Sequence, residues 1–124
     1  MRIILDTNFL VYCAKRKIDY VSEMPVSGKL VVLSSVVSEL EKLAEKAKKA
    51  RDKEAASLAL QILDKNIKEN KIEVLDTEEE VDKVIINLVD KKDVVATMDK
   101  ELKEKLKGKA RILSIRKGKK LEVL

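Results

Sequence analysis

The chain has 124 residues, a net charge of +5 and a pI near 9.2; 45% of its residues are hydrophobic and 40% are charged. This apolar content is enough for one core and argues against disorder, while the basic surplus favours polyanionic partners. Because Cys13 is the only cysteine and histidine is absent, internal disulfides, Cys/His zinc sites and histidine acid–base catalysis are excluded.

The first half of the chain alternates short apolar runs with helical patterns. Pro25 and Gly28 indicate a loop, and Ser34 with Ser35 is suited to capping the helix that follows. The expected elements are a strand over residues 2–5, a helix over 7–17, a strand over 30–33, a helix from 34 to about 49 and a helix over 55–70. Between the last two helices, residues 48–53 are expected to form a charged hinge.

The second half repeats this alternation. Thr77 and Glu80 match a capping box, and Lys117 with Gly118 is expected to turn the chain into its last strand. The expected elements are a strand over residues 72–75, a helix over 81–89, a strand over 94–97, a helix over 99–107 and strands over 111–115 and 121–124. Strands that alternate with helices predict right-handed βαβ units. We therefore expect a single α/β domain over residues 1–124, with three layers and a central, mostly parallel twisted sheet flanked by helices.

Four acidic residues fall at or just after the ends of predicted strands. They are Asp6, Glu39, Asp82 and Asp99. Ligands of an open α/β sheet bind at the carboxyl edge of its strands, and carboxylates gathered there repel one another unless a cation neutralises them. Oxygen donors of this kind hold Mg²⁺ or Mn²⁺. One or two such ions could clamp a phosphodiester and activate a water molecule, which requires no histidine.

Each of these acids also has a purely structural interpretation. Asp6 and Asp99 stand where helix N-caps are expected, and aspartate is a common N-cap. Glu39 could be a solvated helix residue, although it borders the apolar stripe of its helix. Asp82 has close rivals in the glutamates just before it, so the identity of the third acid stays open.

The segments around these acids resemble the four acidic motifs of the PIN domain, a family of metal-dependent nucleases that act mostly on RNA. The segments are DTNFL at 6–10, VVSELEKL at 36–43, VDKVIINLV at 81–89 and VVATMDKEL at 94–102. The resemblance spans nearly the whole chain in the family's motif order. It implies a PIN-like fold, Mg²⁺ or Mn²⁺ as cofactor, and metal-site acids at Asp6, Glu39, Asp82 and Asp99. It further implies Asn8 and Thr97 as supporting residues, whereas Lys83 departs from the second aspartate that many relatives carry there.

Within the family, ATMDKELKEKLK and the trailing strand pair are most similar to the group of small-subunit rRNA-processing nucleases and their small archaeal relatives. This implies an endoribonuclease with a role in rRNA processing. The alternative is the VapC toxin branch, which is similar in length and whose members need an antitoxin partner. A homodimer would be in keeping with relatives, which often pair. The high Lys and Glu content suggests a hyperthermophilic source.

Lysine and arginine concentrate in two stretches that are candidates for holding RNA. Ten lie between residues 100 and 120 and five between residues 46 and 53. Phosphate contacts of this kind give sequence-independent, salt-sensitive binding, which we expect from Lys100, Lys103, Lys107, Lys49 and Arg51. Aromatic residues are too scarce to predict a base-stacking platform. The alternative is the solvated surface of a lysine-rich protein.

Three other classes of protein are alternatives to a nuclease. A non-catalytic RNA-binding or assembly module that kept the fold is the main one, and Lys83 motivates it. An aspartyl-phosphate enzyme built on Asp6 is disfavoured, because Asn8 stands where such enzymes need a second acid. A nucleotide-binding switch would need a glycine-rich phosphate loop. Without a signal-peptide pattern or an apolar run of membrane-span length, the chain is expected to be cytoplasmic.

Overall fold

The computed structural model describes residues 1–117 and 119–124, so Gly118 of the expected turn lies outside the described residues. The described strands form one sheet in the order β3-β2-β1-β4-β5-β6. Their bounds are β1 Arg2–Leu5, β2 Lys29–Leu33, β3 Ile72–Leu75, β4 Val94–Ala96, β5 Arg111–Arg116 and β6 Lys120–Val123. The first five are parallel and β6 is antiparallel to β5, which confirms the mostly parallel α/β sheet.

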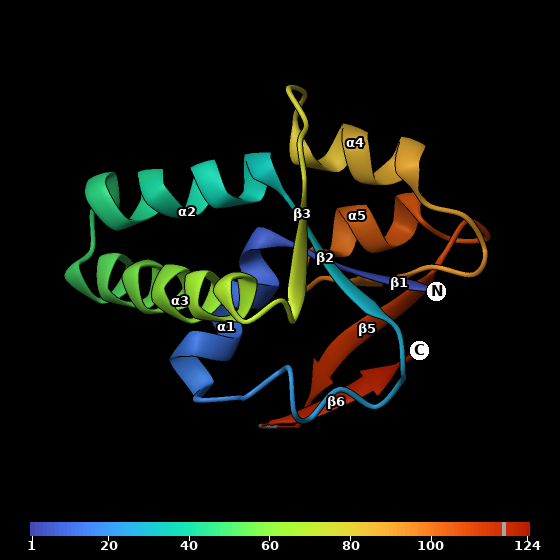
Figure 1. The fold of residues 1–124 in the computed structure, drawn as a ribbon, viewed down its shortest axis with the longest axis horizontal. Helices are drawn as coiled ribbons and strands as arrows, with labels where there is room; N and C mark the ends of the chain where they lie inside the picture. Colours follow the sequence, from blue (N-terminus) through green and yellow to red (C-terminus); the bar gives the residue numbers. More distant parts are fainter. Residues whose placement is uncertain (118) are drawn as a thin grey trace.

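Five helices connect the described strands (Figure 1). Their bounds are α1 Thr7–Arg16, α2 Ser34–Lys46, α3 Ala50–Lys68, α4 Val81–Leu88 and α5 Lys100–Lys105. The helices α1, α2 and α3 pack against one another, and α2 and α3 lie side by side as a helical hairpin. No helix in the described part of the chain is long and apolar enough to span a membrane.

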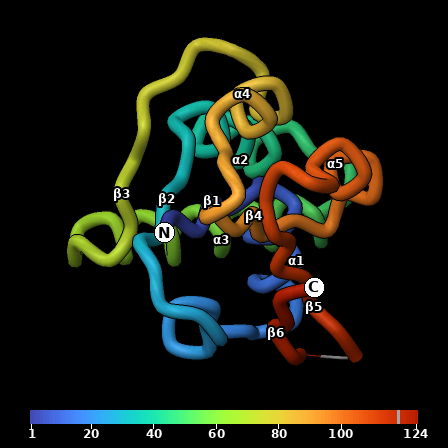
Figure 2. The backbone as a smooth tube through the Cα atoms, turned by 90° about the vertical axis from the view of Figure 1, so that its right-hand side faces the viewer, coloured from blue at the N-terminus to red at the C-terminus, as the bar shows by residue number. Residues whose placement is uncertain are grey.

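The order of the strands creates a crevice at the centre of the sheet. The chain winds outward from β1 through β2 to β3, and then crosses back to β4 on the other side of β1. Because parallel crossovers are right-handed, this reversal puts α1, α2 and α3 on one face and α4 and α5 on the other. Figure 2 follows the long return from β3 to α4. The boundary between β1 and β4 is therefore the topological switch point, where open α/β sheets bind ligands.

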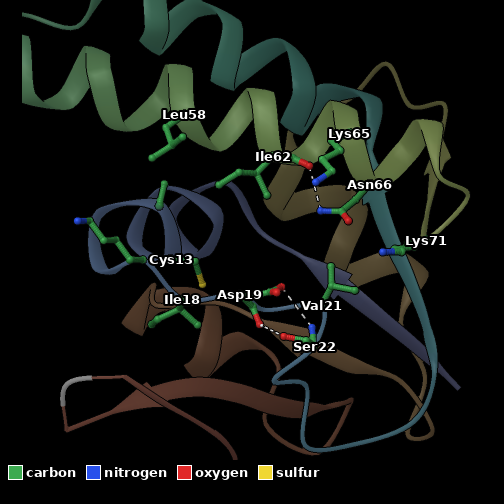
Figure 3. Close-up of a pocket in the computed structure, with 12 residues that line it drawn as sticks. Cys13, Ile18, Asp19, Val21, Ser22, Leu58, Ile62, Lys65, Asn66 and Lys71 are labelled. Carbon is green, nitrogen blue, oxygen red and sulfur yellow. Dashed lines mark hydrogen bonds between the residues drawn. The ribbon is translucent and has the colours of Figure 1, made fainter.

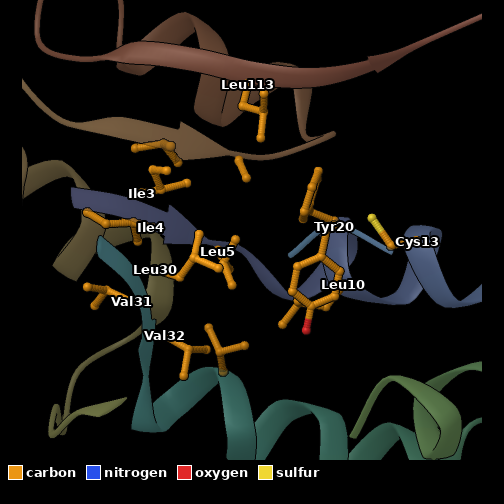
Figure 4. Close-up of a cluster of buried hydrophobic side chains, with 14 of the residues drawn as sticks. Ile3, Ile4, Leu5, Leu10, Cys13, Tyr20, Leu30, Val31, Val32 and Leu113 are labelled. Carbon is orange, nitrogen blue, oxygen red and sulfur yellow. The ribbon is translucent and has the colours of Figure 1, made fainter. Parts of the chain in front are cut away.

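The core holds the two central strands rigidly. Ile3, Ile4 and Leu5 of β1 are fully buried (Figure 4), because parallel strands covered on both faces are apolar throughout. Helices from both faces contribute fully buried side chains, among them Phe9, Leu40, Leu63, Ile85 and Leu102. Any residue directly after β1 is consequently fixed in place.

The predicted side-chain caps of α2 and α4 were wrong, and one set of contacts explains both. The helix α2 has no side-chain cap, and neither does α4. Instead, the Ser34 hydroxyl accepts a hydrogen bond from the Thr77 backbone N–H at 2.8 Å and donates to the Thr77 carbonyl at 3.1 Å. The Ser35 and Thr77 hydroxyls also lie 3.1 Å apart. The predicted capping residues therefore bind one another, which ties the β3–α4 connection to the start of α2.

The charged segment before α3 was also predicted incorrectly. The helix begins at Ala50, so most of the hinge expected over residues 48–53 belongs to its first turns. Lys15 of α1 pairs with Asp52 at 3.2 Å, which gives this charged stretch a partner across the helix interface. Local charge patterning predicted a break, whereas residues 50–53 continue into α3 as helix.

An ion pair closes the other edge of the sheet, where the strands begin. Asp93 is 3% exposed and accepts hydrogen bonds from the Arg2 guanidinium at 2.7 and 3.2 Å and from the Arg2 backbone N–H at 3.2 Å. Arg2 also donates to the Leu88 carbonyl at 3.0 Å, and the Asp90 N–H donates to Asp93. This Arg2–Asp93 clamp joins the starts of β1 and β4.

Candidate metal centre

Asp6 occupies the switch point between β1 and β4. Its backbone N–H donates to the Ala96 carbonyl at 3.0 Å, which continues the pairing of the two strands by one residue. The side chain caps α1 by accepting from the Thr7 N–H at 2.9 Å, so the structural interpretation of Asp6 as an N-cap holds. The residue is 5% exposed. N-cap side chains are usually solvated. The capping role therefore does not explain why Asp6 is buried.

Burial makes the Asp6 carboxylate costly to ionise. Burial raises the pKa of Asp6 to about 6. Hydrogen bonds from the Thr97 hydroxyl and the Thr7 N–H oppose this rise in pKa, and the negative charges of Asp82 and Glu39 add to it. Asp6 is therefore held by donors that fix its orientation, and it lies among like charges.

Glu39 of α2 is joined to Thr7, the residue after Asp6, by a hydrogen bond that sequence analysis missed. The Thr7 hydroxyl donates to Glu39 Oε2 at 2.6 Å. Thr7 is buried, whereas Glu39 is exposed. The only sign of this hydrogen bond in the sequence was the position of Thr7 between Asp6 and Asn8.

Thr97 connects the first and fourth acids. Its hydroxyl is fully buried, donates to Asp6 Oδ2 at 2.8 Å and accepts from the Asp99 N–H at 3.1 Å. Asp99 caps α5 by accepting from the N–H groups of Glu101 and Leu102, as its structural interpretation predicts. Thr97 therefore makes a hydrogen bond to each of these two acids. Asn8 is exposed and makes no side-chain hydrogen bond to the acids within the described residues.

Replacing Thr97 with valine is expected to raise the pKa of Asp6 above about 6 and to lower the free energy of unfolding by about 1–3 kcal/mol. Valine keeps the shape of threonine but leaves Asp6 Oδ2 and the Asp99 N–H without their shared partner. Carboxyl NMR titration and urea unfolding measure the two effects. Thr97→Ser keeps the hydroxyl and should leave the pKa of Asp6 unchanged. An unchanged pKa of Asp6 in Thr97→Val would contradict the assigned hydrogen bond.

Asp82 completes the acidic group from α4. It is half-buried, and burial raises its pKa, with further increases from the charges of Asp99 and Glu39 and a decrease from Lys105. Lys83, the departure from the family pattern, is exposed. The four predicted acids therefore lie within electrostatic reach of one another at the carboxyl edge of the sheet.

The donors fit a hard divalent cation, although they do not enclose one. None of the four acids forms a salt bridge within residues 1–117 and 119–124. No group of three or more Asp, Glu or Cys side chains in the same residues is arranged closely enough to surround an ion. A buried carboxylate without a positive partner, among other oxygen donors, is the environment that Mg²⁺ or Mn²⁺ would compensate.

The basic residues expected to hold RNA divide into two groups. Lys103 donates to the buried Ser114 hydroxyl at 2.9 Å and Lys107 pairs with Glu104 at 3.0 Å, so both ammonium groups already have partners. Lys100 is exposed at the start of α5. Lys49 and Arg51 are exposed at the α2–α3 turn, which Figure 1 places at the far end of the molecule from α5. The two clusters do not adjoin.

Comparison with known proteins places this geometry in a family. Residues 3–118 match the family model described as "PIN like domain". The chain is also similar to "Ribonuclease VapC4" of Methanocaldococcus jannaschii, with 41% identity over 112 residues that cover 85% of this chain and 82% of that protein. The family match includes the strands and helices that carry the four acids.

Proposed function

The chain belongs to the family of PIN-like domains, and on that premise we propose that it is a divalent-metal-dependent endoribonuclease of the VapC toxin type. The observation that carries the proposal is Asp6, a buried carboxylate with no positive partner among the described residues, at the switch point of the sheet. The similarity to a protein named a ribonuclease supports RNA as the substrate.

The toxin branch is favoured over the rRNA-processing group that the motif around Asp99 suggested. The relative with 41% identity is a VapC ribonuclease, and its identity extends over most of both chains. A toxin of this kind would have an antitoxin as its partner. The expected cytoplasmic location and a homodimer follow from the same analogy.

The residues at the site have different proposed roles. Asp6, Glu39, Asp82 and Asp99 would hold the cation, which, when bound, supplies positive charge for the phosphodiester and for an attacking water. The hydroxyls of Thr7 and Thr97 orient Glu39 and Asp6, as partners behind ligands do. Asp6 is buried and thereby shielded from bulk water, and Lys100, which is exposed at the start of α5, would contact a neighbouring phosphate.

Cleavage of a fluorescent single-stranded RNA tests the proposal. Wild-type protein should cleave it with Mn²⁺ or Mg²⁺ and not with EDTA, and expression of the chain without a partner should arrest growth of the host. Asp82→Asn should raise the Mn²⁺ concentration for half-maximal cleavage at least about tenfold, whereas the matched Glu80→Gln should leave it unchanged. Binding of RNA without cleavage, together with no metal-induced rise in melting temperature, would favour the non-catalytic module.

A further inference from the structure

A cavity of about 430 Å³ lies at the C-terminal end of α1, and the acidic group lies at its N-terminal end. Figure 3 shows it between α3 on one side and α1 with the α1–β2 loop on the other. The helix α1 begins at the acid Asp6 and ends beside the cavity, where Lys17 follows it in a left-handed backbone conformation. The cavity and the candidate metal centre are therefore separate features of the chain.

Apolar side chains line the cavity on both sides, among polar ones. Leu58 and Ile62 line it from α3, and Ile18 and Val21 line it from the loop. Leu58 is 43% exposed and marks the rim where apolar surface meets solvent. A volume of this size lies within the range of small-molecule sites.

Positive charge predominates around these walls. Lys17, Lys65 and Lys71 line the cavity, against the single carboxylate of Asp19. Lys71 pairs with Glu69 at 3.6 Å, and neither Lys17 nor Lys65 forms a salt bridge in the described part of the chain. Two uncommitted ammonium groups at an apolar cavity are complementary to an anion that carries an apolar body.

One buried polar residue lines the cavity. Asn66 is 9% exposed, and its Nδ2 donates to the Ile62 carbonyl at 2.9 Å, so its side chain is held in place on α3.

From these observations we propose that this cavity binds a small organic anion with an apolar body, such as an aromatic or aliphatic acid. The apolar part lies between Leu58 and Ile62 of α3 and the loop residues Ile18 and Val21. The anionic group lies at the ammonium groups of Lys17 and Lys65. This site is independent of the proposed nuclease function, because it uses none of the residues of the candidate metal centre.

The test uses 8-anilino-1-naphthalenesulfonate, a fluorescent aromatic sulfonate, with the full chain. Wild type should bind it saturably, one molecule per chain, with a dissociation constant of about 10–100 µM. Lys65→Glu and Leu58→Asp, both changes of exposed side chains, should each weaken binding at least about tenfold. Lys68→Glu makes the same charge reversal on α3 outside the cavity and should bind as wild type does.

Competition distinguishes the two classes of acid. Displacement of the dye by decanoate indicates an aliphatic ligand, and displacement by 1-naphthoate alone indicates an aromatic one. Unsaturable binding, or equal binding by Lys65→Glu and wild type, would overturn the proposal. Asp6→Asn should bind the dye as wild type does. RNA cleavage therefore tests the nuclease function, and dye binding tests this cavity, independently of each other.

Discussion

Replacing Asp6 with asparagine is expected to lower RNA cleavage at least about a thousandfold and, at the same time, to stabilise the metal-free protein at neutral pH. The first effect follows because asparagine lacks the charge that would hold the cation at the switch point. The second follows because asparagine cannot ionise, whereas the buried carboxylate must do so above its pKa of about 6. A single change therefore moves activity and stability in opposite directions.

The sign of the stability effect depends on pH. A carboxyl whose pKa is raised on folding binds more protons in the folded state than in the unfolded state between about pH 4 and pH 6. The free energy of unfolding of the wild type should fall as the pH rises through this window, relative to Asp6→Asn. Above the window the difference should reach up to about 3 kcal/mol, from two pKa units at 1.36 kcal/mol each.

Urea unfolding in EDTA at a series of pH values measures this difference, and the RNA assay measures the loss of cleavage. Asp64→Asn removes an exposed carboxylate from α3, so it should change neither quantity. Addition of Mn²⁺ should raise the melting temperature of wild type and of Asp64→Asn but not that of Asp6→Asn. Full cleavage by Asp6→Asn, or a stability difference that does not vary with pH, would contradict the role given to this carboxylate.

Much of the arrangement around Asp6 was predictable because it follows from local pattern and topology. The apolar run of β1 ends at Asp6, and alternation of strands with helices brings the ends of parallel strands to one edge. The positions of Glu39, Asp82 and Asp99 follow from the same rule. Their role as metal ligands remains a prediction, because a bound ion depends on side-chain placement that strand order does not determine.

Contacts between residues far apart in the chain could not be predicted in this way. Ser34 and Thr77 each look like a helix cap in the sequence, and only the fold shows that they bind one another across 43 positions. The hydrogen bond from Thr7 to Glu39 and the engagement of Lys103 by Ser114 are of the same kind. A polar side chain has several candidate partners in a sequence, and packing selects one.

The Arg2–Asp93 clamp is another such contact, and Asp93→Ala is expected to lower the free energy of unfolding by about 3–5 kcal/mol. The Asp93 side chain is 4% exposed and accepts hydrogen bonds from Arg2 and from two backbone N–H groups. Alanine leaves the guanidinium of Arg2, whose side chain is 33% exposed, with only the Leu88 carbonyl as a partner. The loss of free energy of unfolding is large because the Arg2 charge and two backbone N–H donors lose their acceptor together.

The pH dependence of the clamp is opposite to that of Asp6. Burial alone would raise the pKa of Asp93, but hydrogen bonds and the positive charge of Arg2 outweigh burial and lower it. The folded state then binds fewer protons than the unfolded state, so the clamp stabilises the protein fully above about pH 4 and is lost as the pH falls below that value. The deficit of Asp93→Ala should consequently shrink in acid.

A double variant without either charge separates loss of the ion pair from simple loss of packing. Arg2→Met combined with Asp93→Leu removes both charges, and it should cost less than Asp93→Ala alone, because no buried ion is left unpaired. Asp52→Ala breaks the exposed pair with Lys15, in which both side chains are 41% exposed, and should cost no more than about 1 kcal/mol. Equal losses in Asp93→Ala and Asp52→Ala would show that burial adds nothing to the clamp. The clamp lies at the edge of the sheet opposite the acids, so Asp93→Ala should retain cleavage at temperatures where it stays folded.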